Sequence, residues 1–303
     1  MTEDAAGLPA VGSVGLGNMG GRIAARIIET GRELVGFDRD SAQAEAYGVP
    51  AAASLADLVA RVDIVLLSLP DSTVIEAVAR GEDGLLASCR QGQIVVDLST
   101  AAPSSTRKLA GEFASRGVTF LDAGVSGGAA AAEKGELTLM VGGDAEALAR
   151  TREVLERFSA RIVHLGPSGA GHTTKLLNNF LNAVTLAATA EVMVAARIAD
   201  LDLHQVLDVI NASSGVSFAS LNRFPKIVDG DYLEGGLSGR LMMKDVTLYV
   251  DMLREIGAPS LNAAGPLASF GLAIGLGYGD VISNRVVDAI GDVAGGVRLH
   301  EDA

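Results

Sequence analysis

One stretch of helical spacing in the middle of the chain carries the side chains best suited to chemistry. Lys175 is followed one helical turn later by Asn178 and Asn179. Asn182 lies at i+7, so these positions form one polar stripe on a helix. Burial lowers the pKa of a lysine, and a lysine with a lowered pKa can exchange a proton with an alcohol near neutral pH. The alternative is a solvated helix face, where asparagine is less expected than glutamate or lysine.

A glycine-rich run near the start of the chain has the spacing of a phosphate-binding turn. The run is Gly15-Leu16-Gly17-Asn18-Met19-Gly20. It follows an apolar segment that predicts a strand and opens a segment that predicts a helix. In such a turn the first glycine permits the tight bend, the second lets a pyrophosphate approach the backbone, and the third lets helix and strand pack closely. The alternative is an ordinary glycine turn, because a chain with 37 glycines matches the pattern often.

Further cofactor candidates follow the next predicted strands. Asp38 comes about 20 residues after the glycines, where a carboxylate accepts hydrogen bonds from a ribose diol and repels a 2′-phosphate, which favours NAD. Arg39 can hold that phosphate, so NADP remains an alternative cofactor. Asp38 could instead be a helix cap before Ser41. The Leu69-Pro70 turn and the turn ending at Thr100 also close apolar runs. Ligands of an open α/β sheet lie beyond such strand ends, although simple turns would look alike.

A second candidate binding site follows a later apolar run. Ser126, Gly127 and Gly128 close the segment Asp122–Gly128, which follows a strand predicted over Val118–Leu121. A serine hydroxyl beside unhindered backbone N–H groups makes a small nest that suits a carboxylate. The alternative is a flexible loop.

The order of predicted elements indicates an α/β fold with two domains. Strands and helices alternate over residues 1–165, which predicts a doubly wound, mostly parallel sheet that binds a dinucleotide. Residues 166–303 show helical periodicity only, and predict an all-helical substrate and oligomerisation domain. A long helix predicted over His172–Ile198 joins the two. The predicted strands are Val11–Gly15, Glu33–Phe37, Ile64–Leu69, Ile94–Leu98, Val118–Leu121, Leu137–Val141 and Arg161–His164.

Composition excludes several function classes. The 303 residues carry 24 basic and 37 acidic side chains, a net charge of −13, which speaks against nucleic acid as a partner. The single cysteine, Cys89, and four scattered histidines predict no metal site and fit a reducing, cytoplasmic location. The N-terminal segment lacks the apolar region of a secretory signal. The uncharged stretch Ile256–Gly279 contains prolines and glycines, so we expect a buried helix at a subunit contact rather than a membrane span.

Four motifs, in this order, resemble those of the β-hydroxyacid dehydrogenases, which include 3-hydroxyisobutyrate dehydrogenase and tartronate semialdehyde reductase. The motifs are Gly15–Gly20, the Val-Ser-Gly-Gly that ends Asp122–Gly128, Gly169-Ala170-Gly171 with Lys175 and Asn178-Asn179, and Lys244-Asp245. The resemblance covers about residues 10–295. It implies a Rossmann-type domain, an all-helical domain, and homodimers or homotetramers in which the helical domains pack together.

The resemblance also implies an activity and residue roles. The activity is hydride transfer between NAD or NADP and the carbinol carbon of a small β-hydroxy acid. Lys175 would be the general acid/base, and Asn179 would hold the substrate beside it. The remaining implied roles are acid-group binding by Ser126, Gly127 and Gly128, cofactor contact by Leu69, Pro70 and Thr100, and closure on the nicotinamide side by Lys244.

The chain departs from the family pattern in ways that bear on these roles. Gly124 stands where the family usually has proline before Val-Ser-Gly-Gly, so we expect a looser loop there. Asn178 stands where the 6-phosphogluconate enzymes have histidine, which disfavours that substrate. Imine reductases share the fold and generally lack the lysine, so Lys175 argues against them. The alternatives that stay open are an imine or sugar-acid reductase on the same scaffold, and a non-catalytic nucleotide-binding protein.

Overall fold

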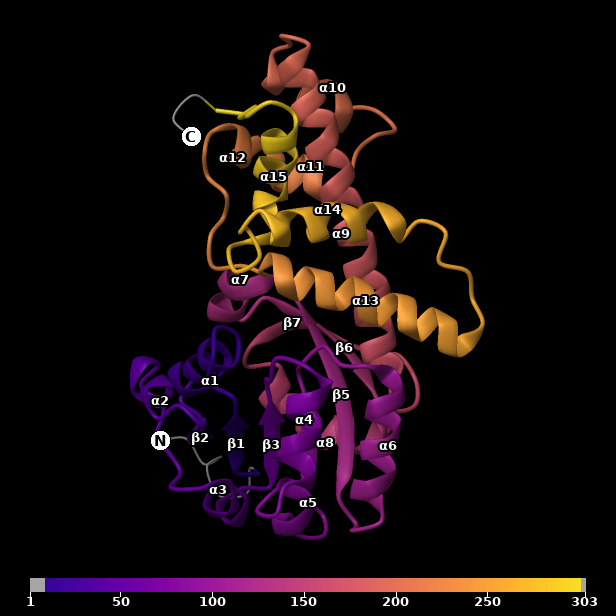
Figure 1. The fold of residues 1–303 in the computed structure, drawn as a ribbon. Coiled ribbons are helices and arrows are strands. Elements are labelled where there is room, and N and C mark those ends of the chain that lie inside the picture. The colour runs from indigo at the N-terminus through magenta and orange to yellow at the C-terminus, as the bar shows by residue number, and fades with distance from the viewer. Residues whose placement is uncertain (1–8, 301–303) are drawn as a thin grey trace. The chain divides into compact units, whose positions relative to one another are not determined.

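The computed structural model describes residues 9–300, which divide into two compact units. One unit reaches to Lys175 and the other begins at Leu176. The domain boundary predicted near residue 165 stays a prediction. The first unit holds a seven-stranded sheet and the second is helical, so the chain has the predicted fold class (Figure 1).

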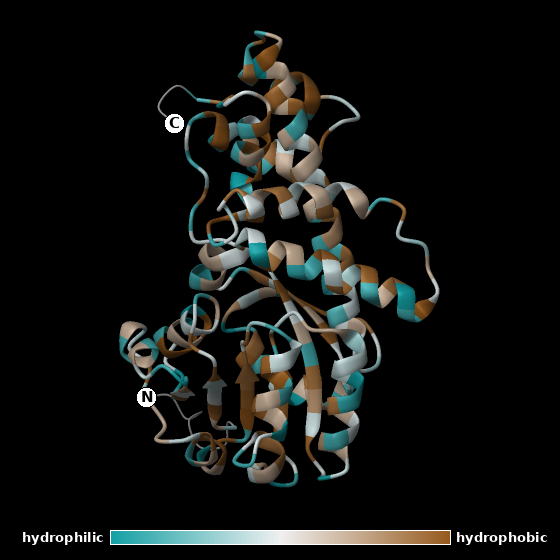
Figure 2. Ribbon diagram, viewed as in Figure 1, coloured by the Kyte–Doolittle hydropathy of each residue, from teal (hydrophilic) through white to brown (hydrophobic). Residues whose placement is uncertain are grey.

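The sheet has the strand order β2-β1-β3-β4-β5-β6-β7. Strands β1 to β5 are parallel, β6 is antiparallel to β5, and β7 is parallel to β6. Continuous apolar runs such as Ile64–Leu67 are buried on both faces, as parallel strands under helices require. Figure 2 shows hydrophobic residues concentrated in these central strands. The strands are β1 Val11–Val14, β2 Leu34–Phe37, β3 Ile64–Leu67, β4 Ile94–Asp97, β5 Thr119–Ser126, β6 Leu137–Gly142 and β7 Ser159–His164.

Helices cover both faces of the sheet and make two separate cores. One core contains Ile23 and Ile27 of α1 and Leu155 of α8. The other contains Leu109 and Phe113 of α6, together with α3, α4 and α5. The helices of this unit are α1 Gly20–Glu29, α2 Ala42–Ala46, α3 Leu55–Arg61, α4 Ser72–Arg80, α5 Leu85–Ser88, α6 Pro103–Ala114, α7 Gly128–Lys134 and α8 Ala145–Leu155.

Strand β5 is longer than the sequence predicts. It runs through Ser126 because residues Asp122 to Ser126 pair with β6 over their whole length. The prediction that Asp122–Ser126 follow the strand as a loop is therefore wrong. Gly124 pairs with Met140 of β6, so the expected looser loop at Gly124 is also wrong.

The second unit contains no strand among its described residues. The long helix α9, Ala170–Ile198, supplies Leu186 and Met193 to its core, which also contains Phe224, Met242 and Phe270. The remaining helices are α10 Leu203–Asn211, α11 Phe218–Asn222, α12 Phe224–Val228, α13 Gly239–Ile256, α14 Ala264–Gly275, the 3₁₀ turn η1 Ser283–Arg285 and α15 Val286–Val293.

Two apolar stretches bear on the question of a membrane span. Within the described residues, α9 is the helix whose length and hydropathy would suffice, a test that core helices of other proteins also pass. The uncharged stretch Ile256–Gly279 contains only the 12-residue α14, which is too short to span a bilayer. Within the chain only one side of α14 is buried, and Leu261 before it is 86% exposed, so the burial of this stretch at a subunit contact stays a prediction. Residues 1–8, on which the signal-peptide prediction rests, lie outside the described residues.

Candidate active site

The three glycines of the turn between β1 and α1 each have a different structural role. Gly15 has φ +87°, and an added Cβ would lie 2.2 Å from the carbonyl oxygen of Ser68. At Gly20 an added Cβ would lie 2.0 Å from the carbonyl oxygen of Gly15. Gly17 is exposed and has open space where a Cβ would stand. The turn is therefore closed by its outer glycines and open at the middle one, which fits a pyrophosphate at the start of α1.

Asp38 is tied to this turn by hydrogen bonds. Its carboxylate accepts the N–H of Leu16 at 2.7 Å and the N–H of Asp40 at 2.9 Å. The N–H of Ala42 in α2 donates to Asp40 and not to Asp38, so Asp40 takes the place of the helix cap predicted at Asp38. Arg39 is exposed.

The turns after β3 and β4 are joined by a serine whose role the sequence did not predict. Ser99 Oγ accepts the N–H of Leu69 at 2.9 Å, and its own N–H donates to Asp97 at 3.0 Å. The hydrogen bond to Ser99 thus joins the Leu69-Pro70 turn to the turn that ends at half-buried Thr100, at the carboxyl edge of the sheet. The strand order reverses between β1 and β3, where doubly wound sheets bind their ligands.

Arg22 is a second residue that sequence reasoning missed. It lies in the first turn of α1, and its guanidinium donates to the carbonyl of Asn18 at 2.8 Å and to the hydroxyl of Tyr47 at 3.1 Å. It also pairs with Glu133 at 2.7 Å. A basic side chain two residues after the last glycine was the available signal, since it places a positive charge beside a phosphate site.

The Ser-Gly-Gly segment forms the end of β5 and the start of α7. Ser126 is half-buried, whereas Gly127 and Gly128 are exposed. The two glycines have φ +132° and +74°, so any other residue would be strained at both positions. The bend exposes main chain without a Cβ, as a carboxylate nest requires.

Lys175 lies in the second turn of α9, half-buried against β5. An added Cβ at Gly124 would lie 2.6 Å from its Cβ and 3.0 Å from its Cγ. The aliphatic stem of Lys175 therefore packs on the bare backbone of the strand that ends at Ser126.

The first turn of α9 is held by a buried carboxylate. Asp122 accepts the N–H of Gly169 at 2.7 Å and that of His172 at 2.8 Å. A carboxylate at a helix N-terminus accepts hydrogen bonds from otherwise unpaired N–H groups and is attracted to the positive end of the helix dipole. His172 Nδ1 is 2.7 Å from Thr106 Oγ1, and its Nε2 is 3.9 Å from Asp97. Burial raises the pKa of Asp97, and His172 acts in the opposite direction.

In the second unit the structure brings Asn179 together with Lys244 and Asp245. Asn179 is 3% exposed, and its Nδ2 donates to Asp245 at 2.5 Å. The other carboxylate oxygen of Asp245 is 3.2 Å from Lys244 Nζ. Asn178 is exposed, so the buried member of the asparagine pair is Asn179, and the solvated-face alternative is wrong at that position. The sequence analysis named Asp245 only as part of the Lys244-Asp245 motif and did not predict its contact with Asn179.

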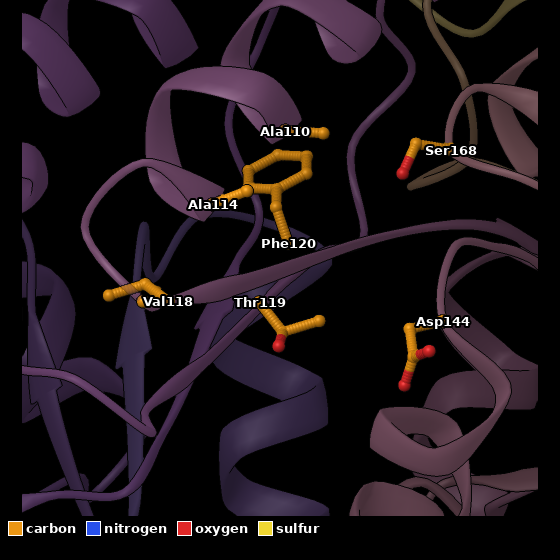
Figure 3. A pocket seen from close by; sticks show the side chains of 8 residues that line it. Ala110, Ala114, Val118, Thr119, Phe120, Asp144 and Ser168 are labelled. Atoms are coloured by element: carbon orange, nitrogen blue, oxygen red, sulfur yellow. The ribbon is translucent and has the colours of Figure 1, made fainter.

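One cavity of the first unit contains none of the predicted site residues (Figure 3). Its volume is about 420 Å³, and it lies around the start of β5, whereas Ser126 ends that strand. It is lined by Ala110, Ala114, Gly117, Val118, Thr119, Phe120, Asp144 and Ser168. Within residues 9–300 no group of three or more His, Cys, Asp or Glu side chains could hold a metal ion.

Comparison with known proteins decides the family. Residues 10–166 match the NAD binding domain of 6-phosphogluconate dehydrogenase. Residues 169–279 match the NAD-binding model of NADP-dependent 3-hydroxyisobutyrate dehydrogenase. The NAD-dependent L-serine dehydrogenase of Pseudomonas aeruginosa is 36% identical over 277 residues, which cover 88% of this chain and 93% of that protein. The chain belongs to the β-hydroxyacid dehydrogenase family.

Other relatives of this β-hydroxyacid dehydrogenase differ in the substrate they are named for. The 2-(hydroxymethyl)glutarate dehydrogenase of Eubacterium barkeri is 34% identical, over 89% of this chain and 92% of that protein. The structure of Mycobacterium tuberculosis 3-hydroxyisobutyrate dehydrogenase with L-serine has a TM-score of 0.84 at 30% identity, covering 92% of this chain and 98% of that chain. The protein is thus an NAD(P)-dependent dehydrogenase of the CH–OH group of a hydroxy acid.

Proposed function

We propose that this dehydrogenase reversibly oxidises the carbinol carbon of a small β-hydroxy acid, with Lys175 as the general acid/base. The observation that carries the proposal is the placement of Lys175. Its stem is half-buried against Gly124 of β5. Gly124 lies two residues before Ser126 on the same strand. The support is that the stem of a protonatable side chain packs against the strand whose end is proposed to hold the acid group.

The residues of the chain then divide the work. A bound nicotinamide cofactor supplies the hydride chemistry. Lys175 takes the hydroxyl proton during oxidation and returns it during reduction, a transfer worth roughly 10²- to 10⁴-fold in rate. Asn179 holds the substrate beside Lys175. The carboxylate of Asp245 accepts a hydrogen bond from the amide of Asn179 and so fixes its orientation. The nest of Ser126, Gly127 and Gly128 binds the carboxylate.

We infer that NAD is preferred over NADP. The support is the carboxylate of Asp38, which lies beside the glycine turn and would repel a 2′-phosphate. Gly15 to Gly20 would hold the pyrophosphate, and the turns at Leu69-Pro70 and Thr100 would contact the rest of the cofactor. Lys244 would act on the nicotinamide side.

The cofactor proposal makes a direct prediction. Asp38→Asn removes the negative charge and keeps a side chain that can accept hydrogen bonds. We expect the ratio of kcat/KM with NAD to kcat/KM with NADP to fall about tenfold, or about 1.4 kcal/mol. Asp40→Asn is the control, because Asp40 is exposed and does not bond to the glycine turn. An unchanged ratio in Asp38→Asn would remove the argument for NAD.

We also propose that the protein is a cytoplasmic homodimer or homotetramer assembled through the helical unit. The support is a row of exposed apolar side chains on α9, where Leu177, Leu181 and Val192 are 44%, 64% and 49% exposed. Apolar side chains repeated along one helix are typical of a surface that a second copy covers. The single half-buried cysteine fits a reducing compartment.

A substrate panel tests the proposed function. Purified protein is assayed with 3-hydroxyisobutyrate, serine, glycerate, threonate and 2-(hydroxymethyl)glutarate, each with NAD and with NADP. We expect measurable kcat/KM for at least one β-hydroxy acid. Inactivity with the whole panel, together with turnover of a cyclic imine or a phosphorylated sugar acid, would contradict the proposal.

A further inference from the structure

A buried histidine joins the start of α9 to three other elements of the first unit. His172 is fully buried, and its main-chain N–H donates to Asp122 of β5 at 2.8 Å. Its Nδ1 is 2.7 Å from the hydroxyl oxygen of Thr106 in α6. Its other ring nitrogen, Nε2, is 3.9 Å from the carboxylate of Asp97, the last residue of β4. The imidazole is therefore held from several sides and faces one carboxylate.

The ring nitrogen that faces Asp97 has no hydrogen-bond partner among the described residues. Asp97 is 1% exposed, so solvent screens the interaction between the two groups only weakly. A carboxylate oxygen and a deprotonated ring nitrogen are both acceptors, so they attract each other only when a proton lies between them. Imidazole binds a proton more tightly than a carboxylate, which places this proton on Nε2.

Asp97 in turn holds the two turns that carry cofactor candidates. Its carboxylate accepts the N–H of Ser99 at 3.0 Å, and Ser99 Oγ accepts the N–H of Leu69 at 2.9 Å. Rotation of the Asp97 carboxylate would release Ser99 and, through it, the Leu69-Pro70 turn. The turn that ends at Thr100 follows Asp97 directly along the chain. The orientation of one buried carboxylate therefore sets the place of both turns.

We propose that His172 is a positioning residue for the cofactor, because a proton on its Nε2 attracts the Asp97 carboxylate and so holds the turns after β3 and β4 in place. The proposal rests on the proposed function, in which these turns contact the cofactor. Thr106 and Asp122 keep the ring and the main chain of His172 from moving toward another partner. The effect is therefore expected in cofactor binding and not in the proton transfer at Lys175.

Two substitutions separate the roles of the two ring nitrogens. A glutamine side chain is long enough to place an N–H donor near the position of Nε2, whereas asparagine reaches only about as far as Nδ1. His172→Gln therefore keeps a donor toward Asp97, and His172→Asn keeps only a partner for Thr106. In His172→Asn we expect the dissociation constant for reduced cofactor, measured by fluorescence, to rise about tenfold, or about 1.4 kcal/mol. In His172→Gln it should stay near that of the original protein.

The matched control is His164→Asn, in β7 of the same unit. His164 is exposed, and its ring contacts the carbonyl oxygen of Gly143 at 2.8 Å and not a buried carboxylate. This variant should bind cofactor like the original protein. Equal dissociation constants for His172→Asn and His172→Gln would overturn the proposal, because the ring would then only fill space.

Nitrogen-15 NMR of the histidine rings tests the proposal on the unsubstituted protein, so it does not depend on whether a variant folds. The chain has four histidines, and the fully buried ring of His172 is the one whose proton should exchange most slowly with solvent. We expect Nε2 of His172 to carry a proton at neutral pH. A deprotonated Nε2 at neutral pH would overturn the proposal.

Failure of this proposal and failure of the proposed function give different results. If Lys175→Met keeps full kcat, or the original protein binds no reduced cofactor, the proposed function fails. If Lys175→Met loses kcat while His172→Asn binds cofactor as well as the original protein does, the positioning role of His172 fails alone.

Discussion

The two units hold the same helix by different means. In the first unit, the carboxylate of Asp122 accepts main-chain N–H groups, one of them from His172. In the second, the carboxylate of Asp245 accepts the side-chain amide of Asn179. Along the sequence of α9, Lys175 lies between His172 and Asn179.

The difference shows what each contact demands of the sequence. A contact through main-chain N–H groups constrains only the acceptor and the glycines that permit close approach. It does not dictate the residue types on the helix itself. A contact through a side chain fixes both partners, because a buried amide without its acceptor costs about 1–3 kcal/mol. The sequence indicated the asparagine pair Asn178 and Asn179 by residue type, whereas it did not indicate the role of Asp122.

Of the substitutions that test these two contacts, we expect Asp245→Ala to lower kcat/KM the most. The change leaves the Asn179 amide without its buried acceptor and removes the ion pair with Lys244. We expect kcat/KM to fall roughly ten- to hundredfold, which corresponds to about 1–3 kcal/mol. Steady-state kinetics with the best substrate of the panel measures it.

The matched control for Asp245→Ala is Asp251→Ala on the same helix. Asp251 is half-buried and pairs with Arg254 at 2.8 Å, a contact that contributes at most about 1 kcal/mol. We expect its kcat/KM to stay near that of the original protein. Equal losses in the two variants would show that α13 as a whole, and not the contact with Asn179, carries the effect.

A smaller effect concerns the buried carboxylates of the first unit. Burial raises the pKa of Asp97, so the folded protein takes up a proton there at a higher pH than the unfolded chain. The ionised carboxylate therefore costs stability above its folded pKa, and this cost is relieved as the pH falls toward the ordinary value of 3.8. His172 and Asp122 are the charged or titratable neighbours that act on it.

Asp97→Asn removes this titration and keeps an oxygen that can accept the N–H of Ser99. We expect the original protein to gain free energy of unfolding relative to Asp97→Asn as the pH is lowered through the raised pKa. Urea denaturation at a series of pH values from neutrality to about 4 measures the difference. A difference that does not vary with pH would show that Asp97 does not titrate in this window.

Sequence reasoning located most of the fold because local patterns settle most of it. Short apolar runs bounded by turn residues, such as Ile64–Leu67, predict buried strands, and the spacing of Gly15, Gly17 and Gly20 predicts a phosphate-binding turn. The length of β5 could not be predicted, because Asp122 and Gly124 look like loop residues until β6 pairs with them. The missing information was the pairing of segments distant in the sequence.

The candidate site was predicted where side chains carry the chemistry and missed where they support other groups. Residue type and spacing indicated Lys175, Asn178 or Asn179, and Ser126. The family resemblance then selected Asn179. Arg22 and Ser99 were missed because their contacts join separate turns of the sheet edge, which sequence spacing does not reveal. These residues fix the geometry of the turns that surround the cofactor candidates.

The most direct test of the account is Lys175→Met, measured by kcat and by the dissociation constant for the cofactor. Methionine keeps an unbranched apolar stem against Gly124 and removes the amine. The account predicts that kcat falls by roughly 10²- to 10⁴-fold while cofactor binding stays unchanged. Lys108→Met, an exposed lysine in α6 of the same unit, should change neither quantity. A Lys175→Met variant with undiminished kcat would contradict the role of Lys175 as the general acid/base.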